Sequence, residues 1–571
     1  MSEIETPPLQ QHLKHIGQEW QKAARPSCSA SSEHYSDRQN KRTGEFHGTY
    51  LLFLCVFGAI IGVQLLVSLG VTPNTAIIGA MAAMIVARVP LKFFGHYRSV
   101  HVQNLAQSAT SAATFGAANS LLLPIAIPWL FGRPDMVVPM FIGVALAMLL
   151  DGFLLYKLFN TKLFPATGAW PHGVAAAESI KAGDQGGKQA VLLGIGIFLG
   201  ALGSFFKFPT AALGTAFIGN VWALGMLGIG FLLRGYSSPV FGIDINALYI
   251  PHGIMAGAGL VALIQIIFLM RGKKDDAHDE RAAAEKAHAA KHGVEMPEHK
   301  DEQIGRTIGI GSIGFALISV LIAFGSGMYH HMSVGWLIAF MFYAAFAAFV
   351  HEMIVGLAAM HSGWFPAFAV ALITLLVGIL IGFPPEALAM LCGFAAATGP
   401  AFADMGYDLK AGWILRGNGK NPAFELDGRR QQFLAASMAF LIAIPVVAFV
   451  YQDFFSQGLV PPVAKVYIAA IQAGVSFDIA KSLLIWAIPG ALIQFIGGPS
   501  RQMGVLLATG LLINNPMAGW AVLIGLGIRI AVLKIKGPDA RGPLEVLAAG
   551  LIAGDALLSF FSSIIPGLRH K

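Results

Sequence analysis

Carboxylate, amide and imidazole side chains recur inside long apolar stretches of this sequence, where they could hydrogen-bond a polar solute or carry protons. A charge at the centre of a bilayer costs about 2.5–3.5 kcal/mol on insertion scales, so such residues usually face a bundle interior or an aqueous path. Four clusters contain them, at residues 102–120, 169–183, 242–257 and 398–417. The chemistry they suggest is solute binding, proton transfer and gating.

The first cluster carries a stripe of uncharged polar residues. Asn104, Gln107, Ser108 and Ser111 follow i, i+3, i+4, i+7 spacing, which places them on one face of a helix. Amides and hydroxyls suit a passage for a polar solute because they replace lost water without fixing a counter-charge. Hydrogen bonding between neighbouring helices is the structural alternative, and the spacing leaves both open.

The second cluster, AWPHGVAAAESIKAG at 169–183, combines helix breakers with charge. We expect Pro171 and Gly173 to break a helix, after which Glu178 and Lys181 fall at i, i+3. A broken helix exposes backbone groups and directs a half-helix dipole at the midplane, as in many secondary transporters. A buried Glu178 there could bind a proton, whereas an internal ion pair with Lys181 is the structural alternative.

The third cluster repeats the Pro-His-Gly triplet of the second. His172 and His252 occupy its centre in the two copies and could bind a proton or a metal-bearing solute. Two histidines without an acidic third ligand do not predict a fixed metal site, so we expect none. The repeat is interpreted as two half-helix breaks that face each other, or as coincidence.

The fourth cluster places two carboxylates one turn apart, at Asp404 and Asp408. Basic residues follow closely, at Lys410, Arg416, Arg429 and Arg430. Opposite charges at a helix end can lock a gate or anchor the membrane interface. We expect the gate for the two aspartates and the anchor for the arginines.

Further ionisable residues are buried in apolar sequence at Asp151, His351–Glu352 and Asp555. Each could be a proton site or part of a packing pair. An intramembrane aspartyl protease would need two aspartates at membrane depth, and Asp404 or Asp408 with Asp555 could supply them. The Gly-Leu-Gly-Asp type of motif is missing, so we do not expect an enzyme.

Composition indicates the elements that must position these residues. Of the 571 residues, 56% are hydrophobic and 12% are charged, about half the share usual in soluble proteins. Apolar stretches long enough to cross about 30 Å of hydrocarbon recur along the chain. We predict an all-α polytopic membrane protein with about 14–16 transmembrane helices. Broken or re-entrant segments are expected at 160–182 and 235–250, and Pro124 and Pro128 should interrupt the helix over 102–131.

Four parts are expected along the chain: a polar arm (1–48), a first helical half (49–270), a charged linker (271–305) and a second helical half (306–571). Lys and Arg gather in the arm, in the loop at 88–98 and in the linker, which predicts a cytoplasmic N-terminus in an inner or plasma membrane. Orientation also accounts for the net charge of +7 without a nucleic-acid partner. No cofactor is expected.

Four blocks, in order, resemble the oligopeptide transporter (OPT) family, in particular a prokaryotic branch related to the yellow stripe-like metal–chelate transporters. These blocks are NLAQSATSAAT, WPHGVAAAESIKAG, ADMGYDLKAGWILRG with the later RRQQF, and AAGLIAGDALL. The sequence departs from the family pattern at Trp170, where the family has Phe, and at His172, where it has Glu. Tyr407 replaces a Gln, and an insertion, NGKNPAFELD, precedes RRQQF.

The resemblance implies a secondary active symporter that uses the proton gradient to import short peptides or metal–chelate complexes. No G-x-x-x-x-G-K-[ST] phosphate loop is present, so an ion gradient is the expected energy source. Alternatives are an ion exchanger, a channel-like protein or an intramembrane hydrolase. Expected partners are the solute, protons and lipid, with a homodimer as one option. Expected solute-binding residues are Asn104, Gln107, Ser108, Ser111, Trp170, His172 and His252, and expected proton-coupling residues are Glu178, Asp404 and Asp408.

Overall fold

The computed structural model describes residues 47–564, apart from 71–98, 162, 169, 184–186, 273–300, 363–366 and 475. All but the last two residues of the expected N-terminal arm and most of the expected linker therefore lie outside the described residues. From Leu52 onward the described helices belong to one compact unit.

Helices make up the described chain, with one isolated β-bridge between Phe159 and Phe164. In the first half the helices are α3 (His47–Leu69), α5 (Val100–Phe115), α6 (Leu123–Leu130), α7 (Val137–Leu158), α8 (Pro171–Gly183), α9 (Gly187–Phe205), α10 (Thr210–Ile218), α11 (Val221–Phe241) and α12 (Ile250–Gly272). In the second half they are α14 (Asp301–Gly325), α15 (Val334–Ser362), α16 (Ala367–Ile381), α17 (Pro385–Ala397), α18 (Pro400–Leu415), α19 (Pro422–Ser456), α20 (Pro462–Ala473), α21 (Phe477–Arg501), α22 (Met503–Leu512), α23 (Pro516–Lys536) and α24 (Arg541–Ile564).

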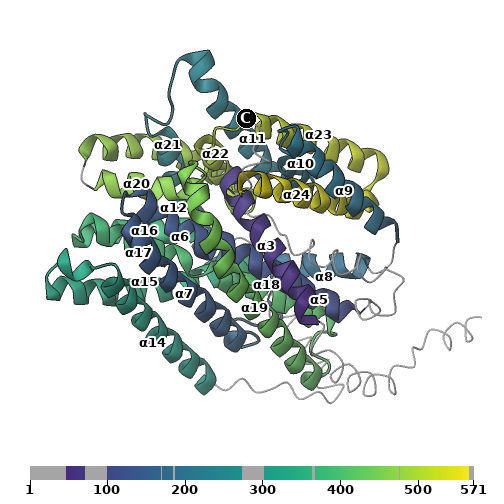
Figure 1. Cartoon of the computed structure of the whole chain (residues 1–571), viewed down its shortest axis with the longest axis horizontal. Helices are drawn as coiled ribbons and strands as arrows, with labels where there is room; N and C mark the ends of the chain where they lie inside the picture. The colour runs from purple at the N-terminus through teal and green to yellow at the C-terminus, as the bar shows by residue number, and fades with distance from the viewer. Residues whose placement is uncertain are drawn as a thin grey trace, which may run out of the picture. The chain divides into compact units, whose positions relative to one another are not determined.

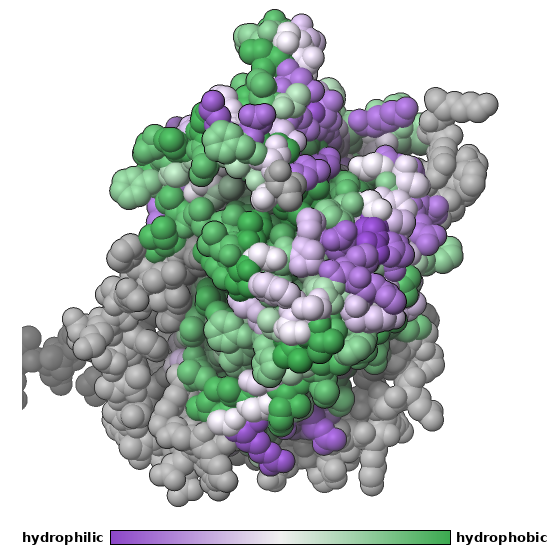
Figure 2. Space-filling model, turned by 90° about the vertical axis from the view of Figure 1, so that its left-hand side faces the viewer, coloured by the Kyte–Doolittle hydropathy of each residue, from purple (hydrophilic) through white to green (hydrophobic). Residues whose placement is uncertain are grey.

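Nine spans in the described residues are long and apolar enough to cross a membrane, and four shorter apolar helices accompany them. The predicted all-α polytopic fold is thereby confirmed. Large hydrophobic side chains lie on the protein surface, among them Phe342, Phe449 and Phe495, as lipid-facing helices require. Figure 2 shows broad hydrophobic areas on one face, with hydrophilic residues gathered in patches.

Two spans form the buried interior. In the apolar window of the span Val100–Leu130, 89% of residues are buried, and in that of Pro385–Leu415 all are buried, against 11% for Phe477–Gly498. The first span contains α5 and α6, and the second contains α17 and α18. In Figure 1, α5 and α18 lie close together, and α5 also packs against α19. Two of the four predicted polar clusters, at 102–120 and 398–417, thus lie on the most buried helices.

The interruption of the 102–131 span differs from the prediction. The chain forms a π-helix over Gly116–Leu122 and returns to α-helix at Leu123, so Pro124 and Pro128 lie inside or at the start of the resumed helix. A proline lacks the N–H that would bond the carbonyl four residues earlier, so the strain is relieved in the turn before Pro124. Such π-turns inside helices are frequent at functional sites.

The two Pro-His-Gly triplets also differ from the predicted helix breaks, because both lie at helix starts. α8 begins at Pro171 and α12 begins at Ile250, and a proline at the first helical positions lacks only an N–H that would be unsatisfied anyway. Gly173 is required by packing: a Cβ atom there would lie 2.4 Å from the Tyr407 carbonyl oxygen of α18. Before the two triplets, the described residues of 159–170 and residues 242–249 are non-helical.

Candidate functional site

The polar stripe of α5 faces the two aspartates of α18. The Gln107 side-chain amide donates a hydrogen bond to Asp408 Oδ1, and Ser111 Oγ donates one to Asp404 Oδ1 at 2.6 Å. Gln107 and Ser111 are four positions apart on α5, and Asp404 and Asp408 are four positions apart on α18. The earlier residue on α5 contacts the later residue on α18. The helices therefore meet in antiparallel register, with two polar contacts one turn apart. All four residues are at most 2% exposed.

Three oxygen atoms in this contact have no hydrogen-bond partner: Gln107 Oε1, Asp404 Oδ2 and Asp408 Oδ2. No ion pair joins either aspartate to a Lys or Arg within the described part of the chain. A buried polar group costs free energy unless a partner satisfies it. The contact therefore presents acceptor atoms that could receive the N–H groups of a solute, or a proton.

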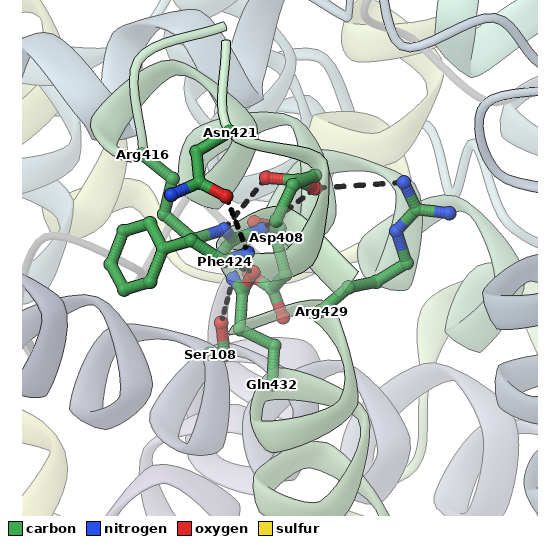
Figure 3. Close-up of polar contacts among 8 residues, drawn as sticks. Ser108, Asp408, Arg416, Asn421, Phe424, Arg429 and Gln432 are labelled. Carbon is green, nitrogen blue, oxygen red and sulfur yellow. Dashed lines mark hydrogen bonds and ion pairs between the residues drawn. The ribbon is translucent and has the colours of Figure 1, made fainter. Parts of the chain in front are cut away.

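A second polar layer connects this contact to the ends of α18 and α19. The Gln432 amide donates to Ser108 Oγ at 3.0 Å and to the Asp408 backbone carbonyl at 2.7 Å. Arg416 Nη1 in turn donates to Gln432 Oε1 at 2.7 Å. Figure 3 shows this chain of side chains running from Ser108 through Gln432 to Arg416. Ser108 takes part in a contact between helices in this structure, and its role in solute binding stays a prediction.

Buried ion pairs complete this layer. Arg416 binds Glu425 through two bonds of 2.7 and 3.1 Å, and Arg429 lies 3.6 Å from the same carboxylate. Sequence reasoning assigned the two arginines but missed Glu425, which lies in the insertion NGKNPAFELD. The sequence signal that could have identified Glu425 is its position four residues before Arg429, at the start of a helix. The arginines are buried within the protein, which fits a lock between helix ends better than the predicted anchor.

Trp170, the residue before α8, packs against α18. Its backbone is in the left-handed region (φ 36°), its N–H donates to the Met360 carbonyl at 2.8 Å, and its indole N–H donates to the Pro165 carbonyl at 3.2 Å. The ring packs directly on Gly406, where a Cβ atom would lie 2.1 Å from Trp170 Cζ3. Trp170 is therefore positioned against α18 as part of the packing, and it is fully buried.

Tyr407 lies between Trp170 and His172, with ring centroids 6.0 and 5.0 Å away. His172 is exposed, whereas Trp170 and Tyr407 are buried. Lys410 of α18 contacts the segment that precedes α8, because its ammonium donates a hydrogen bond to the Ala166 carbonyl at 2.7 Å. α8 packs against both α18 and α5, so the predicted clusters at 102–120, 169–183 and 398–417 come together. Glu178 lies on α8, but its side chain is outside the described set.

Asn104 and His252 take different places. Asn104 is buried at the start of the α5 stripe, and its Oδ1 has no hydrogen-bond partner. His252 is buried near the start of α12, which packs chiefly against α21 and α22 rather than α18. Its assignment to the solute site stays a prediction. The described residues contain no group of three or more His, Cys, Asp or Glu side chains that could hold a metal ion.

A family model matches most of the chain. The model described as OPT oligopeptide transporter protein matches residues 52–266 and 244–565. The two matches together include α5, α8 and α18 and nearly all of the remaining described helices. A search of curated proteins finds no match.

Proposed function

Because the chain belongs to the OPT oligopeptide transporter family, we propose that it is a proton-coupled symporter for short peptides or metal–chelate complexes, with the contact between α5 and α18 as its solute and proton site. Membership of this family and the membrane-spanning helices support transport across a membrane as the general function. Proton coupling, the solute class and the residue roles are the parts proposed here.

The observation that supports the site best is the pair of matched contacts, Gln107 with Asp408 and Ser111 with Asp404. Both aspartates accept from neutral donors, so a proton could bind either carboxyl group without breaking an ion pair. Protonation would remove a buried charge and add an O–H donor. The free Oδ2 atoms and Gln107 Oε1 could then bind the N–H groups of a peptide, or of an amino-acid-derived chelator.

The site is closed to solvent in this structure, so transport requires a second state in which α5 and α18 separate. The polar layer of Ser108, Gln432 and Arg416 connects the contact to the end of α18. A movement of α18 relative to α19 would have to break these bonds and the Arg416–Glu425 pair. We assign this layer the role of a gate, because it is the polar connection between the site and a helix end.

Uptake into proteoliposomes with an imposed pH gradient tests the proposal. One proton crossing 100 mV releases about 2.3 kcal/mol, and one pH unit adds about 1.4 kcal/mol. Together they support accumulation of roughly several hundred-fold per proton. Asp408→Asn and Glu178→Gln are each expected to abolish gradient-driven accumulation of a transported peptide while exchange of labelled for unlabelled peptide continues.

The matched control for this experiment is Asp453→Asn, because Asp453 is an exposed carboxylate on α19. It is expected to accumulate peptide like the wild type. Uphill uptake that is unchanged in both Asp408→Asn and Glu178→Gln would reject the proton assignment. Ion flux that ignores every organic solute would favour an exchanger or a channel-like protein instead.

An intramembrane hydrolase gains no support from the aspartates. Asp555 on α24 accepts a hydrogen bond from the Ala211 backbone N–H in α10, whereas Asp404 and Asp408 bond to α5. Asp555 therefore has a different partner from Asp404 and Asp408, and the pair expected for an aspartyl protease, Asp404 or Asp408 with Asp555, is not formed in the described structure. Product formation from a labelled peptide in detergent, without any gradient, would overturn this conclusion.

A further inference from the structure

A second pair of buried carboxyl groups lies at the break between α17 and α18. Asp151 on α7 and Glu352 on α15 are both fully buried. Asp151 Oδ2 accepts a hydrogen bond of 2.7 Å from the backbone N–H of Gly399, the residue that precedes α18. Asp151 Oδ1 and both carboxyl oxygens of Glu352 have no hydrogen-bond partner among the described residues.

Glu352 lies at the same break, because its neighbour His351 is 3.4 Å from Thr398 Oγ1 and Val355 of the same helix packs against Gly399. No ion pair neutralises either carboxyl group within the described chain. Two other titratable groups on α15 have partners elsewhere. His351 Nε2 lies 2.8 Å from the Ala367 carbonyl, and its Nδ1 lies 3.4 Å from Thr398 Oγ1. On α15, the Tyr343 hydroxyl donates to the Thr374 carbonyl.

Neither Cys392 on α17 nor Tyr407 on α18 can supply a positive charge, and the Lys410 ammonium on α18 donates instead to the Ala166 carbonyl at 2.7 Å. Two ionised carboxylates in this setting would repel each other with no cation to offset the repulsion. A buried charge that is neither paired nor hydrogen-bonded is strongly unfavourable, and a bound proton removes it.

The two groups differ in what surrounds them. Asp151 accepts a hydrogen bond from the backbone N–H of Gly399, directly before α18. The partial positive charge of the helix N-terminus stabilises an anion there. Glu352 has no such donor. We propose that Asp151 and Glu352 bind one proton between them, Glu352 as the carboxylic acid and Asp151 as the carboxylate, and so form a second proton site at the start of α18.

The position of this pair links it to the proposed solute site. α18 starts at Pro400 and carries Asp404 and Asp408 within its first three turns. Gly399 adopts φ 98°, and a Cβ atom there would lie 2.9 Å from the Val355 side chain, so the break has one tight conformation. Loss of the proton would charge Glu352 and repel Asp151, which would weaken the bond to Gly399. The bound proton therefore holds the start of α18. A role in coupling rests on the proposed function, whereas proton binding itself does not.

Infrared difference spectroscopy of the full-length protein in lipid nanodiscs tests proton binding without any gradient or solute. The wild type is expected to show the carbonyl stretch of a buried carboxylic acid, shifted in D2O. Glu352→Gln is expected to lose one such band, and Asp151→Asn should retain it at a shifted frequency. Asp453→Asn, an exposed carboxylate, is the matched control and should leave the band unchanged. A spectrum with no band that depends on Glu352 would overturn the proposal.

Two further measurements keep the test decisive. If Glu352→Gln does not fold, ¹³C labelling of glutamate in a Glu178→Gln background should shift the acid band, and an unshifted band would refute the assignment. Thermal unfolding of wild type in sodium and in choline chloride should coincide. If sodium chloride raises the unfolding temperature of the wild type but not that of Glu352→Gln, the pair binds sodium and the proposed proton site is wrong. Failure here leaves the Asp408→Asn uptake result untouched, so the two proposals are distinguishable.

Discussion

Replacing Glu425 with Gln should destabilise the protein strongly, although the substitution preserves the shape of the side chain. Glu425 lies against two guanidinium groups, at 2.7 Å from Arg416 and 3.6 Å from Arg429. The side chains of Arg416 and Glu425 are only 3% and 5% exposed, so water cannot replace the missing carboxylate. The substitution would leave two buried positive charges side by side without a counter-charge.

The expected loss follows from that burial. Removing one partner of a buried ion pair typically costs about 3–5 kcal/mol, because an uncompensated charge remains in the interior. Arg416 keeps its bond to Gln432, and Arg429 keeps its bond to the Phe159 carbonyl, so we expect the lower end, about 3 kcal/mol. Adding Arg416→Met should recover about 2 kcal/mol, which is the coupling energy of contacting residues in a double-mutant cycle.

Reversible unfolding in mixed micelles, followed by tryptophan fluorescence, measures these free energies. The matched control is the ion pair of Arg541 and Glu545 on α24. Its N–O distance of 2.9 Å is similar to the 2.7 Å of Arg416 and Glu425, but its arginine side chain is 66% exposed. Glu545→Gln should cost about 0.3–0.5 kcal/mol, as exposed pairs one turn apart do, and less at high salt. Additive effects of Arg416→Met and Glu425→Gln, or a loss below about 1 kcal/mol for Glu425→Gln, would refute the buried network.

Further predictions concern the contact between α5 and α18. Ser111→Ala removes the donor to Asp404 and should lower the free energy of unfolding by about 1–3 kcal/mol, measured by the same unfolding assay, because a buried acceptor loses its partner. Gly406→Ala should cost about 1–3 kcal/mol, since its Cβ atom would clash with Trp170. Gly527→Ala, with open space around a helical glycine, should stabilise by up to about 1 kcal/mol; equal effects of the two would contradict the packing described.

The sequence predicted the individual helices and polar faces well, because both follow from local spacing. The stripe of Gln107 and Ser111 and the one-turn spacing of Asp404 and Asp408 were visible as helical periodicity. Their antiparallel match could not be predicted from those patterns, since it joins residues about 300 positions apart. Such long-range register depends on packing, which a single sequence does not report.

The errors have local physical causes. Proline was expected to interrupt helices at Pro124, Pro128 and Pro171, yet it lies inside or at the start of resumed helices, with a π-turn absorbing the missing hydrogen bond before Pro124. Glu425 was overlooked although Arg429 follows it by four residues, because its closer partner, Arg416, lies across a turn between two helices, where helical spacing does not apply.

Accessibility of the stripe to a small charged thiol reagent tests the central claim, that the contact between α5 and α18 opens during transport. Ser111→Cys would be labelled in proteoliposomes, in a background in which Cys28, Cys55 and Cys392 are replaced. Ala109→Cys is the control, because Ala109 is equally buried on α5 but contacts Cys55 of α3. The account predicts that a transported peptide and a pH gradient accelerate labelling at position 111 and not at 109. Equal, unaccelerated labelling at both positions would show that the contact stays closed and is structural.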